Sequence, residues 1–230
     1  MKPLIKVMLI LGAVFAATFV IGRIFGILTV ENVKAWLEVV QSTNPAWVAG
    51  LVIGLLFIDL FVAVPTLTIT LLAGFFLGFP AGMATALSGM SFAAFGGYAI
   101  SLRFGESFLS FLVREEDQRE DLKATFQTSG PVMILLSRAA PIVPEVTACM
   151  AGATRMPFLR YLIFFLLSTV PYVAIAAYAG SISSADSPRP AILASIFLYG
   201  VLWIGWFFFR RHQRQKASEV HNVVAGRAQR

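Results

Sequence analysis

Residues 59–80 read DLFVAVPTLTITLLAGFFLGFP, and residues 138–157 read RAAPIVPEVTACMAGATRMP. In both stretches a charged residue is followed six positions later by the proline of a Val-Pro pair, then by an Ala-Gly pair and a further proline. The copies are separated by 79 residues at the charge and at Val-Pro, by 78 at the glycine and by 77 at the last proline. In a membrane chain, two helix-breaking, charge-bearing segments at corresponding positions of two halves indicate a substrate site at the repeat interface.

The composition is that of an integral membrane protein. Hydrophobic residues make up 58% of the 230 residues and charged residues 13%, against about half and a quarter in soluble domains. The net charge is +6, and six of the 18 Lys and Arg lie in the last 21 residues. Such a juxtamembrane basic tail suits anionic lipid headgroups, so we expect no nucleic-acid partner.

The sequence gives little reason to expect an enzyme. Both histidines, His212 and His221, lie in the basic tail, and Cys149 is the single cysteine. Protease, hydrolase and phosphate-loop motifs are absent, as are paired cysteines for a zinc site. We therefore expect neither catalysis, nor a metal, nor a cofactor.

The apolar spans predict an all-α membrane protein built on an inverted repeat of a re-entrant helical hairpin plus a transmembrane helix. Proline removes a backbone donor, and the freed groups must be satisfied by protein or by a wet cavity, so we expect hairpin tips at the two Val-Pro pairs. The predicted organisation is a first transmembrane helix and outer amphipathic segment over 1–44, a membrane domain over 45–182, a last transmembrane helix over 183–209 and a basic cytoplasmic tail over 210–230. The membrane domain divides into hairpin 1 (about 46–79), a transmembrane helix (81–104), a cytoplasmic helix (106–127), hairpin 2 (about 131–157) and a transmembrane helix (158–180).

The basic residues favour hairpins that enter from opposite faces of the membrane. With the N-terminus inside, fourteen Lys and Arg lie on the inner side and only Arg23, Lys34 and Arg189 on the outer side. This bias follows the positive-inside rule, whereas a full crossing by 46–64 would place the basic tail outside. We therefore expect both termini to be cytoplasmic.

Three ionisable residues are expected deep in the membrane: Asp59, Arg138 and Glu145. Such residues are costly to insert, which makes each a functional hypothesis. In one interpretation Asp59 and Arg138 pair as a structural clasp. In the other, Arg138 holds an anionic headgroup while Asp59 or Glu145 exchanges protons, and the helix N-termini at the breaks favour this because they attract anions. The remaining candidate substrate-binding residues are Pro65, Pro141 and Pro144 at the breaks, Thr66 and Thr68 after the first break, and Gly74 and Gly152 in the Ala-Gly pairs.

Small residues recur at spacings of four, which predicts close helix packing. One series is Gly74, Gly78 and Gly82, and the other is Gly89, Ala93, Gly97, Ser101 and Gly105. Gly74 belongs to both the packing series and the repeat, so it is kept as a candidate for substrate contact.

The order of these features resembles the DedA superfamily, also called VTT-domain or SNARE-associated Golgi proteins, and within it the small bacterial branch related to the yeast Tvp proteins. The resemblance covers about 45–182, and its most specific element is Arg-x-x-Pro-x-x-Pro at Arg138, Pro141 and Pro144. The matching pieces are Val64-Pro65, LLAGFFLG (71–78), LRFGES (102–107), SRAAPIVP (137–144), AGATRMPFLRY (151–161) and Pro171 before Ala-Tyr-Ala-Gly.

The resemblance implies two facing re-entrant hairpins and a role in moving lipids, in the plasma (inner) membrane of a bacterium. It implies polyprenyl phosphate or an anionic phospholipid as partner, with protons as a coupling ion, an essential Arg138 and an acidic role for Asp59. The chain departs from the bacterial DedA branch where Thr66-Leu67-Thr68 follow Pro65 in place of further acidic residues. The first hypothesis is a lipid transporter or scramblase. The alternatives are a proton-coupled small-solute carrier and a membrane scaffold or assembly factor.

Overall fold

The computed structural model describes residues 44–184 apart from 63, 114, 140 and 141, together with 189–205, 207 and the N-terminal pieces 7–14, 16–17, 20, 32 and 34–35. Most of the predicted first transmembrane helix (4–28) and outer segment (30–44), the whole tail (210–230) and Pro141 lie outside the described residues. The described part of the chain is helical throughout its ordered elements and contains no strand. The expected all-α class is therefore confirmed for this part.

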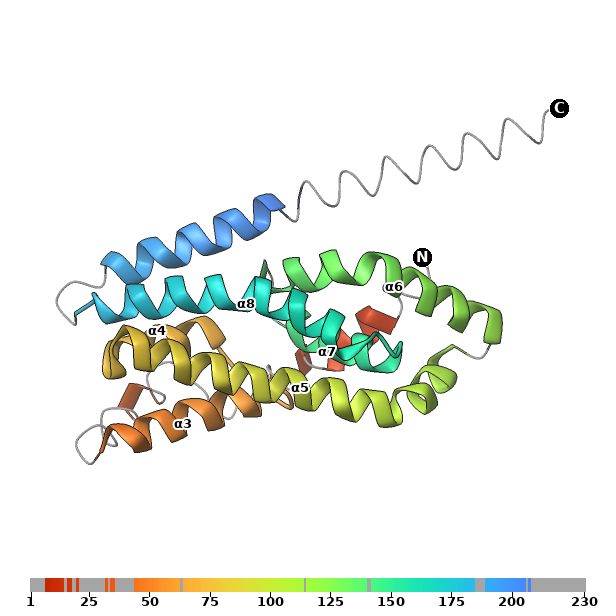
Figure 1. The fold of residues 1–230 in the computed structure, drawn as a ribbon, viewed down its shortest axis with the longest axis horizontal. Coiled ribbons are helices and arrows are strands. Elements are labelled where there is room, and N and C mark those ends of the chain that lie inside the picture. The colour runs from red at the N-terminus through yellow and green to blue at the C-terminus, as the bar shows by residue number, and fades with distance from the viewer. Residues whose placement is uncertain are drawn as a thin grey trace.

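The chain forms two pairs of shorter helices, each followed by a long one (Figure 1). The second pair is bridged by a short 3-10 helix, and one more helix closes the described chain. The elements are α3 (Pro45–Ile58), α4 (Thr66–Leu77), α5 (Phe79–Leu112), α6 (Glu116–Leu136), η1 (Ser137–Ala139), α7 (Val143–Ala153) and α8 (Phe158–Ser181), followed by helix Arg189–Gly205.

The first break lies between α3 and α4, at the predicted Val-Pro pair. Asp59 follows the last residue of α3 and is 6% exposed. Its Oδ1 accepts a hydrogen bond of 2.8 Å from the backbone N–H of Val64. Pro65 then precedes α4, where a missing N–H costs no helical hydrogen bond. The aspartate thus closes the turn that the proline imposes.

The second break separates α6 from α7. After α6 the chain continues as the 3-10 helix η1, which contains Arg138. Ile142 then adopts a left-handed backbone with φ of 75° and caps α7, and Pro144 lies in the first turn. A β-branched residue rarely takes this conformation, so the turn is strained.

The boundaries around α6 differ from the prediction. The cytoplasmic helix expected over 106–127 is divided between the end of α5 and the start of α6, and α6 runs on through Pro131, where a separate hairpin limb was expected. The helix persists because residues at intervals of four from 122 to 134 form one buried face, and this burial outweighs the hydrogen bond lost at proline. The residues on this face are Leu122, Phe126, Gly130 and Ile134.

The two halves of the domain are joined by helix crossings: α4 of the first pair packs on α8, and α7 of the second pair packs on α5. These are the most extensive helix contacts among the described elements. A Cβ on Gly74 would lie 2.0 Å from the carbonyl oxygen of Ala177, and a Cβ on Gly152 would lie 2.2 Å from that of Tyr98. Only glycine allows backbones to approach this closely, so equivalent glycines of the repeat make equivalent crossings.

The predicted small-residue series serve packing with one exception. A Cβ on Gly82 would meet backbone of α4, and one on Gly105 would meet Ala153 of α7 at 2.6 Å. Gly78 has open space around it but a φ of 77°, so it is needed for the turn between α4 and α5.

Within the described part of the chain, two helices are long and apolar enough to cross a membrane, Phe79–Ser107 and Phe158–Ser181. They coincide with the predicted transmembrane helices 81–104 and 158–180. Helix Arg189–Gly205 is apolar but shorter, and it corresponds to the predicted last transmembrane helix. In Figure 1 it runs along α8.

Candidate functional site

A cavity of about 610 Å³ lies between the two helix breaks. Both breaks contribute to it, together with α8 and helix Arg189–Gly205. The lining residues are Asp59, Val64, Pro65, Thr66, Leu67, Thr68, Arg138, Ile142, Pro144, Glu145, Tyr172, Ser195 and Tyr199. The repeated segments recognised in the sequence therefore meet in space around one cavity.

Arg138 is the buried cation of this cavity, with 8% of its surface exposed. Its Nη2 donates to Thr169 Oγ1 at 3.2 Å, and its guanidinium carbon lies 5.5 Å from the centre of the Tyr172 ring. Its Nε is buried and has no hydrogen-bond partner. The α8 side chains therefore hold the guanidinium in place but leave part of its donor capacity unused.

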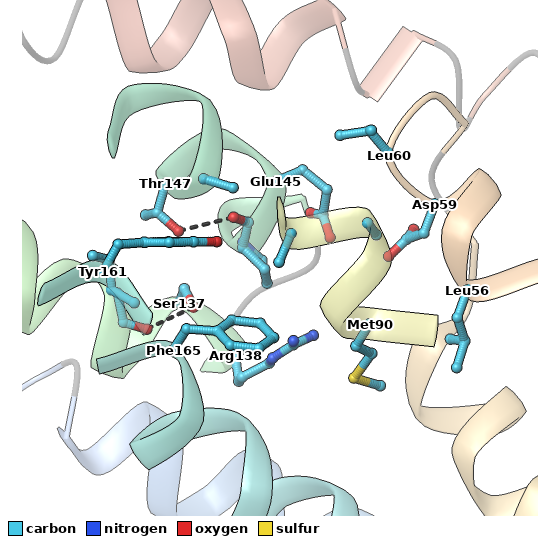
Figure 2. A pocket seen from close by; sticks show the side chains of 15 residues that line it. Leu56, Asp59, Leu60, Met90, Ser137, Arg138, Glu145, Thr147, Tyr161 and Phe165 are labelled. Carbon is cyan, nitrogen blue, oxygen red and sulfur yellow. Dashed lines mark hydrogen bonds between the residues drawn. The ribbon is translucent and has the colours of Figure 1, made fainter. Parts of the chain in front are cut away.

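Two carboxyl groups face this cation across the cavity. Asp59 and Glu145 lie close enough to interact electrostatically with each other and with Arg138. The Oε2 atom of Glu145 is buried and has no hydrogen-bond partner. Figure 2 shows the three charged side chains converging from η1, from α7 and from the turn after α3.

The view in Figure 2 is centred on a second, smaller void of about 20 Å³ that shares Asp59, Arg138, Pro144 and Glu145 with the larger cavity. A space of this size is sufficient for one water molecule. The rest of its lining is mostly apolar and comes from α3, α5 and α8, including Leu56, Met90 and Phe165. The charges therefore lie at the boundary between a dry core and an open cavity.

A direct clasp between Asp59 and Arg138 is not formed. Among the described residues the ion pairs within 4.0 Å are Glu106 with Lys123 and Glu106 with Arg155, and neither cavity carboxylate takes part in one. The Asp59 carboxylate is instead occupied by the backbone of its own turn. The geometry thus favours the interpretation in which Arg138 is available to a ligand.

The N-termini of α4 and α7 both begin at the cavity wall. Neither helix has a side-chain cap on its first amides. Thr66 and Thr68 lie in the first turn of α4, and Glu145 lies in the first turn of α7. Uncapped amides and the helix dipole together make such ends favourable for an anion.

The remaining candidates are placed elsewhere. Gly74 and Gly152 lie at the helix crossings and outside the cavity lining, so the structure gives them a packing contact where a substrate contact was expected. Pro141 lies outside the described residues.

Four polar residues of the site were missed in the sequence: Thr169, Tyr172, Ser195 and Tyr199. Thr169 and Tyr172 are three residues apart, and this spacing places them on one face of α8. That periodicity was visible, but nothing in the sequence marked Arg138 as the group they contact.

The fold and the site together define a helical membrane protein with a charged cavity between two broken-helix segments. A comparison with protein families identifies the group: the VTT domain matches residues 64–182. The chain therefore belongs to the VTT-domain family, the DedA/SNARE-associated family, as the resemblance predicted. VTT domains are associated with membrane proteins of proposed transport function. No curated protein and no solved structure matches the chain significantly.

Proposed function

We propose that the protein moves a lipid with an anionic headgroup between the leaflets of the membrane, and that the headgroup binds in the cavity between the two helix breaks. The observation that carries this proposal is the buried guanidinium of Arg138, which lines a cavity of about 610 Å³ and whose Nε lacks a hydrogen-bond partner. A buried donor without a partner is costly, and a phosphate oxygen is the strongest acceptor for it.

The surroundings of Arg138 support an anion over a neutral ligand. The Tyr172 ring and Thr169 fix the plane of the guanidinium, which favours the two parallel hydrogen bonds that arginine makes to phosphate. The first turn of α4 adds the hydroxyls of Thr66 and Thr68 on another side of the cavity. These groups together would replace the hydration of a phosphate.

We propose that Asp59 or Glu145 exchanges a proton during transport. Two carboxylates and a bound anion in one cavity repel each other, and Arg138 alone cannot neutralise all three. A proton taken up by a carboxyl as the anion binds removes this repulsion. The unpartnered Oε2 of Glu145 is the available position for it.

In the membrane, we propose that the α3–α4 pair and the α6–α7 pair are re-entrant hairpins of an inverted repeat that enter from opposite faces. Support comes from the charge at the two ends of the molecule. Arg155, at the base of the second pair, contacts Glu106 of α5, whereas Phe79, at the base of the first pair, contacts Tyr178 of α8. The end that carries Arg103, Lys123, Arg155 and Arg160 would face the cytoplasm together with both termini, in the plasma membrane of a bacterium.

A proton-coupled carrier for a small anionic solute is the second candidate. The cavity volume of about 610 Å³ falls within the about 300–1,000 Å³ typical of small-molecule sites. The same cation and carboxyls would serve such a solute. A membrane scaffold that transports nothing is the third candidate and is separated from both by the following test.

The test is lipid transfer in proteoliposomes that contain fluorescent phosphatidylglycerol in one leaflet, with polyprenyl phosphate as a second probe. Arg138→Ala should abolish transfer, and Arg138→Lys should retain a small part of it, because lysine keeps the charge but loses the bidentate geometry. Arg103→Ala is the matched control, since Arg103 is an exposed arginine on α5 outside the cavity. It should leave transfer unchanged.

Three outcomes decide between the candidates. Transfer that survives Arg138→Ala in a folded variant contradicts the proposal. Uptake of a small anion without any protein-dependent lipid transfer favours the solute carrier. If neither lipid nor solute moves, and deletion of 114–121 but not Arg138→Ala removes the cellular phenotype, the scaffold is correct.

A further inference from the structure

Helix Arg189–Gly205 has two different faces. Ser195 and Tyr199, one helical turn apart, line the central cavity, and Leu198 between them is buried. The opposite face is apolar, and each of its side chains is more than half exposed. These are Ile192, Leu193, Ile196, Phe197 and Trp203. Tyr199 itself is 38% exposed. A helix with hydroxyl residues at a polar cavity and an apolar outward face is suited to separate that cavity from lipid.

Contacts near both ends fix this helix on the domain. Near its start, the backbone N–H of Ala191 donates to Ser183 Oγ, just after α8, at 3.1 Å. Near its end, a Cβ on Gly205 would lie 3.1 Å from Leu136 Cδ2. Leu136 is the last residue of α6, two positions before Arg138. The helix is therefore held directly beside the segment that carries the buried cation.

Tyr199 and Tyr172 line the same cavity, and the aromatic ring of Tyr172 lies under Arg138. None of the hydrogen bonds among the described residues involves the hydroxyl of Tyr199. Ser195, by contrast, donates to the Ala191 carbonyl at 2.8 Å. The free donor on this wall of the cavity is thus the Tyr199 hydroxyl.

We infer that helix Arg189–Gly205 is the lateral wall of the lipid cavity, and that Tyr199 is a specificity-determining residue that hydrogen-bonds the headgroup held by Arg138. The inference rests on the proposed lipid transport. The helix lies outside the VTT-domain match, which ends at residue 182. The matched domain supplies the charge that binds phosphate, and a flanking helix supplies the contact that distinguishes one headgroup from another.

The position of the wall is tested without transport. In a Cys149→Ala background, Thr68→Cys combined with Ser195→Cys should cross-link within one chain through a short bifunctional maleimide, because both residues line the cavity. Thr68→Cys combined with Phe197→Cys is the matched control and should remain uncross-linked, because Phe197 lies on the outward face. A cross-link in the control but not in the first pair overturns the wall assignment.

The specificity role is tested with vesicles that contain fluorescent phosphatidylglycerol or fluorescent phosphatidylethanolamine. Tyr199→Phe removes the hydroxyl but keeps the ring. It should slow the transfer of one of the two lipids about tenfold, as expected for one lost hydrogen bond to a charged ligand. The ratio of the phosphatidylglycerol rate to the phosphatidylethanolamine rate should therefore change. Phe197→Leu, on the outward face, should leave both rates within about twofold, as expected of a site outside the contact.

The two proposals fail in different ways. If the unmodified protein moves both lipids and Tyr199→Phe leaves the rates and their ratio unchanged, the role of Tyr199 is wrong and lipid transport stands. If the unmodified protein moves neither lipid, nor polyprenyl phosphate, the proposed function is wrong, and the headgroup role of Tyr199 falls with it.

Discussion

Gly152→Ala tests one of the close backbone contacts that join the two halves of the repeat. Gly152 lies where α7 crosses α5, and an added Cβ would lie 2.2 Å from the carbonyl oxygen of Tyr98 and 2.8 Å from the backbone nitrogen of Leu102. Both atoms belong to the backbone, so no rotamer change can relieve the clash. The two helices must separate, and α7 carries Glu145 at its other end.

The expected change in the free energy of unfolding is the difference between two opposing effects of the added methyl group. In a helix interior, alanine is more favourable than glycine by about 0.8–1.0 kcal/mol. Overpacking costs about 1–3 kcal/mol, and a backbone clash belongs at the upper end of that range. The net expectation for Gly152→Ala is a loss of about 2 kcal/mol in the free energy of unfolding. Gly54→Ala, in α3, is the control, because a Cβ there meets nothing within 4 Å.

Thermal unfolding of the purified protein in one detergent measures both variants. Gly54→Ala should be slightly more stable than the unmodified chain, and Gly152→Ala should unfold about 6–12 °C below Gly54→Ala, since 1 kcal/mol corresponds to about 2–4 °C at this chain length. Equal stability of the two variants would refute the close crossing of α5 and α7. A stable but inactive Gly152→Ala would restore the substrate-binding role predicted from the sequence.

Three further predictions address separate contacts. Gly78→Ala should lower the free energy of unfolding by about 1–3 kcal/mol, because φ of 77° with ψ of 170° is accessible almost only to glycine. The cause is the backbone conformation and not a clash, since a Cβ at Gly78 would meet nothing within 4 Å. Thermal unfolding in comparison with Gly54→Ala measures the loss, and an unchanged melting temperature contradicts the prediction. Tyr98→Phe removes the 2.6 Å hydrogen bond that the Tyr98 hydroxyl donates to the Met156 carbonyl. The free energy of unfolding, measured by denaturant titration, should fall by about 1–3 kcal/mol because a buried acceptor loses its partner. An unchanged value would mean that a water molecule replaces the hydroxyl. Glu106→Gln removes the ion pairs with Lys123 and Arg155. It should lower the melting temperature slightly at low salt but not at high salt, because salt screens exposed ion pairs. An equal decrease in melting temperature at both salt concentrations would contradict this prediction.

The positions of the helix breaks could be predicted from the sequence because their causes are local. Proline at 65 and 144 removes a backbone donor wherever the chain places it, and a charge six residues earlier cannot remain in lipid without a partner. Both causes act within one turn of helix. The meeting of the two breaks at one cavity could be predicted because the repeat relates them, and Asp59 and Arg138 line it together.

The partners of these residues depend on packing between distant segments and could not be predicted in the same way. Thr169 and Tyr172 contact Arg138 because α8 passes beside η1, and no motif records that passage. Hairpin 2 was predicted to begin at about residue 131, whereas α6 runs on through Pro131. The interval of four from Leu122 to Ile134 indicates a continuous buried face and was the better signal.

The charges of the cavity are better explained by a ligand than by stability. Replacing a buried ion pair with apolar residues is often neutral or stabilising, so selection for stability alone would remove these groups or pair them closely. Here Asp59 is satisfied by Val64, whereas Arg138 and Glu145 each keep one buried atom without a partner. The two unsatisfied atoms are a donor and an acceptor, and both residues line one cavity. A phosphate that brings a proton meets both requirements, because its oxygen accepts from Arg138 and the proton neutralises the carboxyl. Under the proposed function, anion binding and proton uptake would therefore occur together at this site.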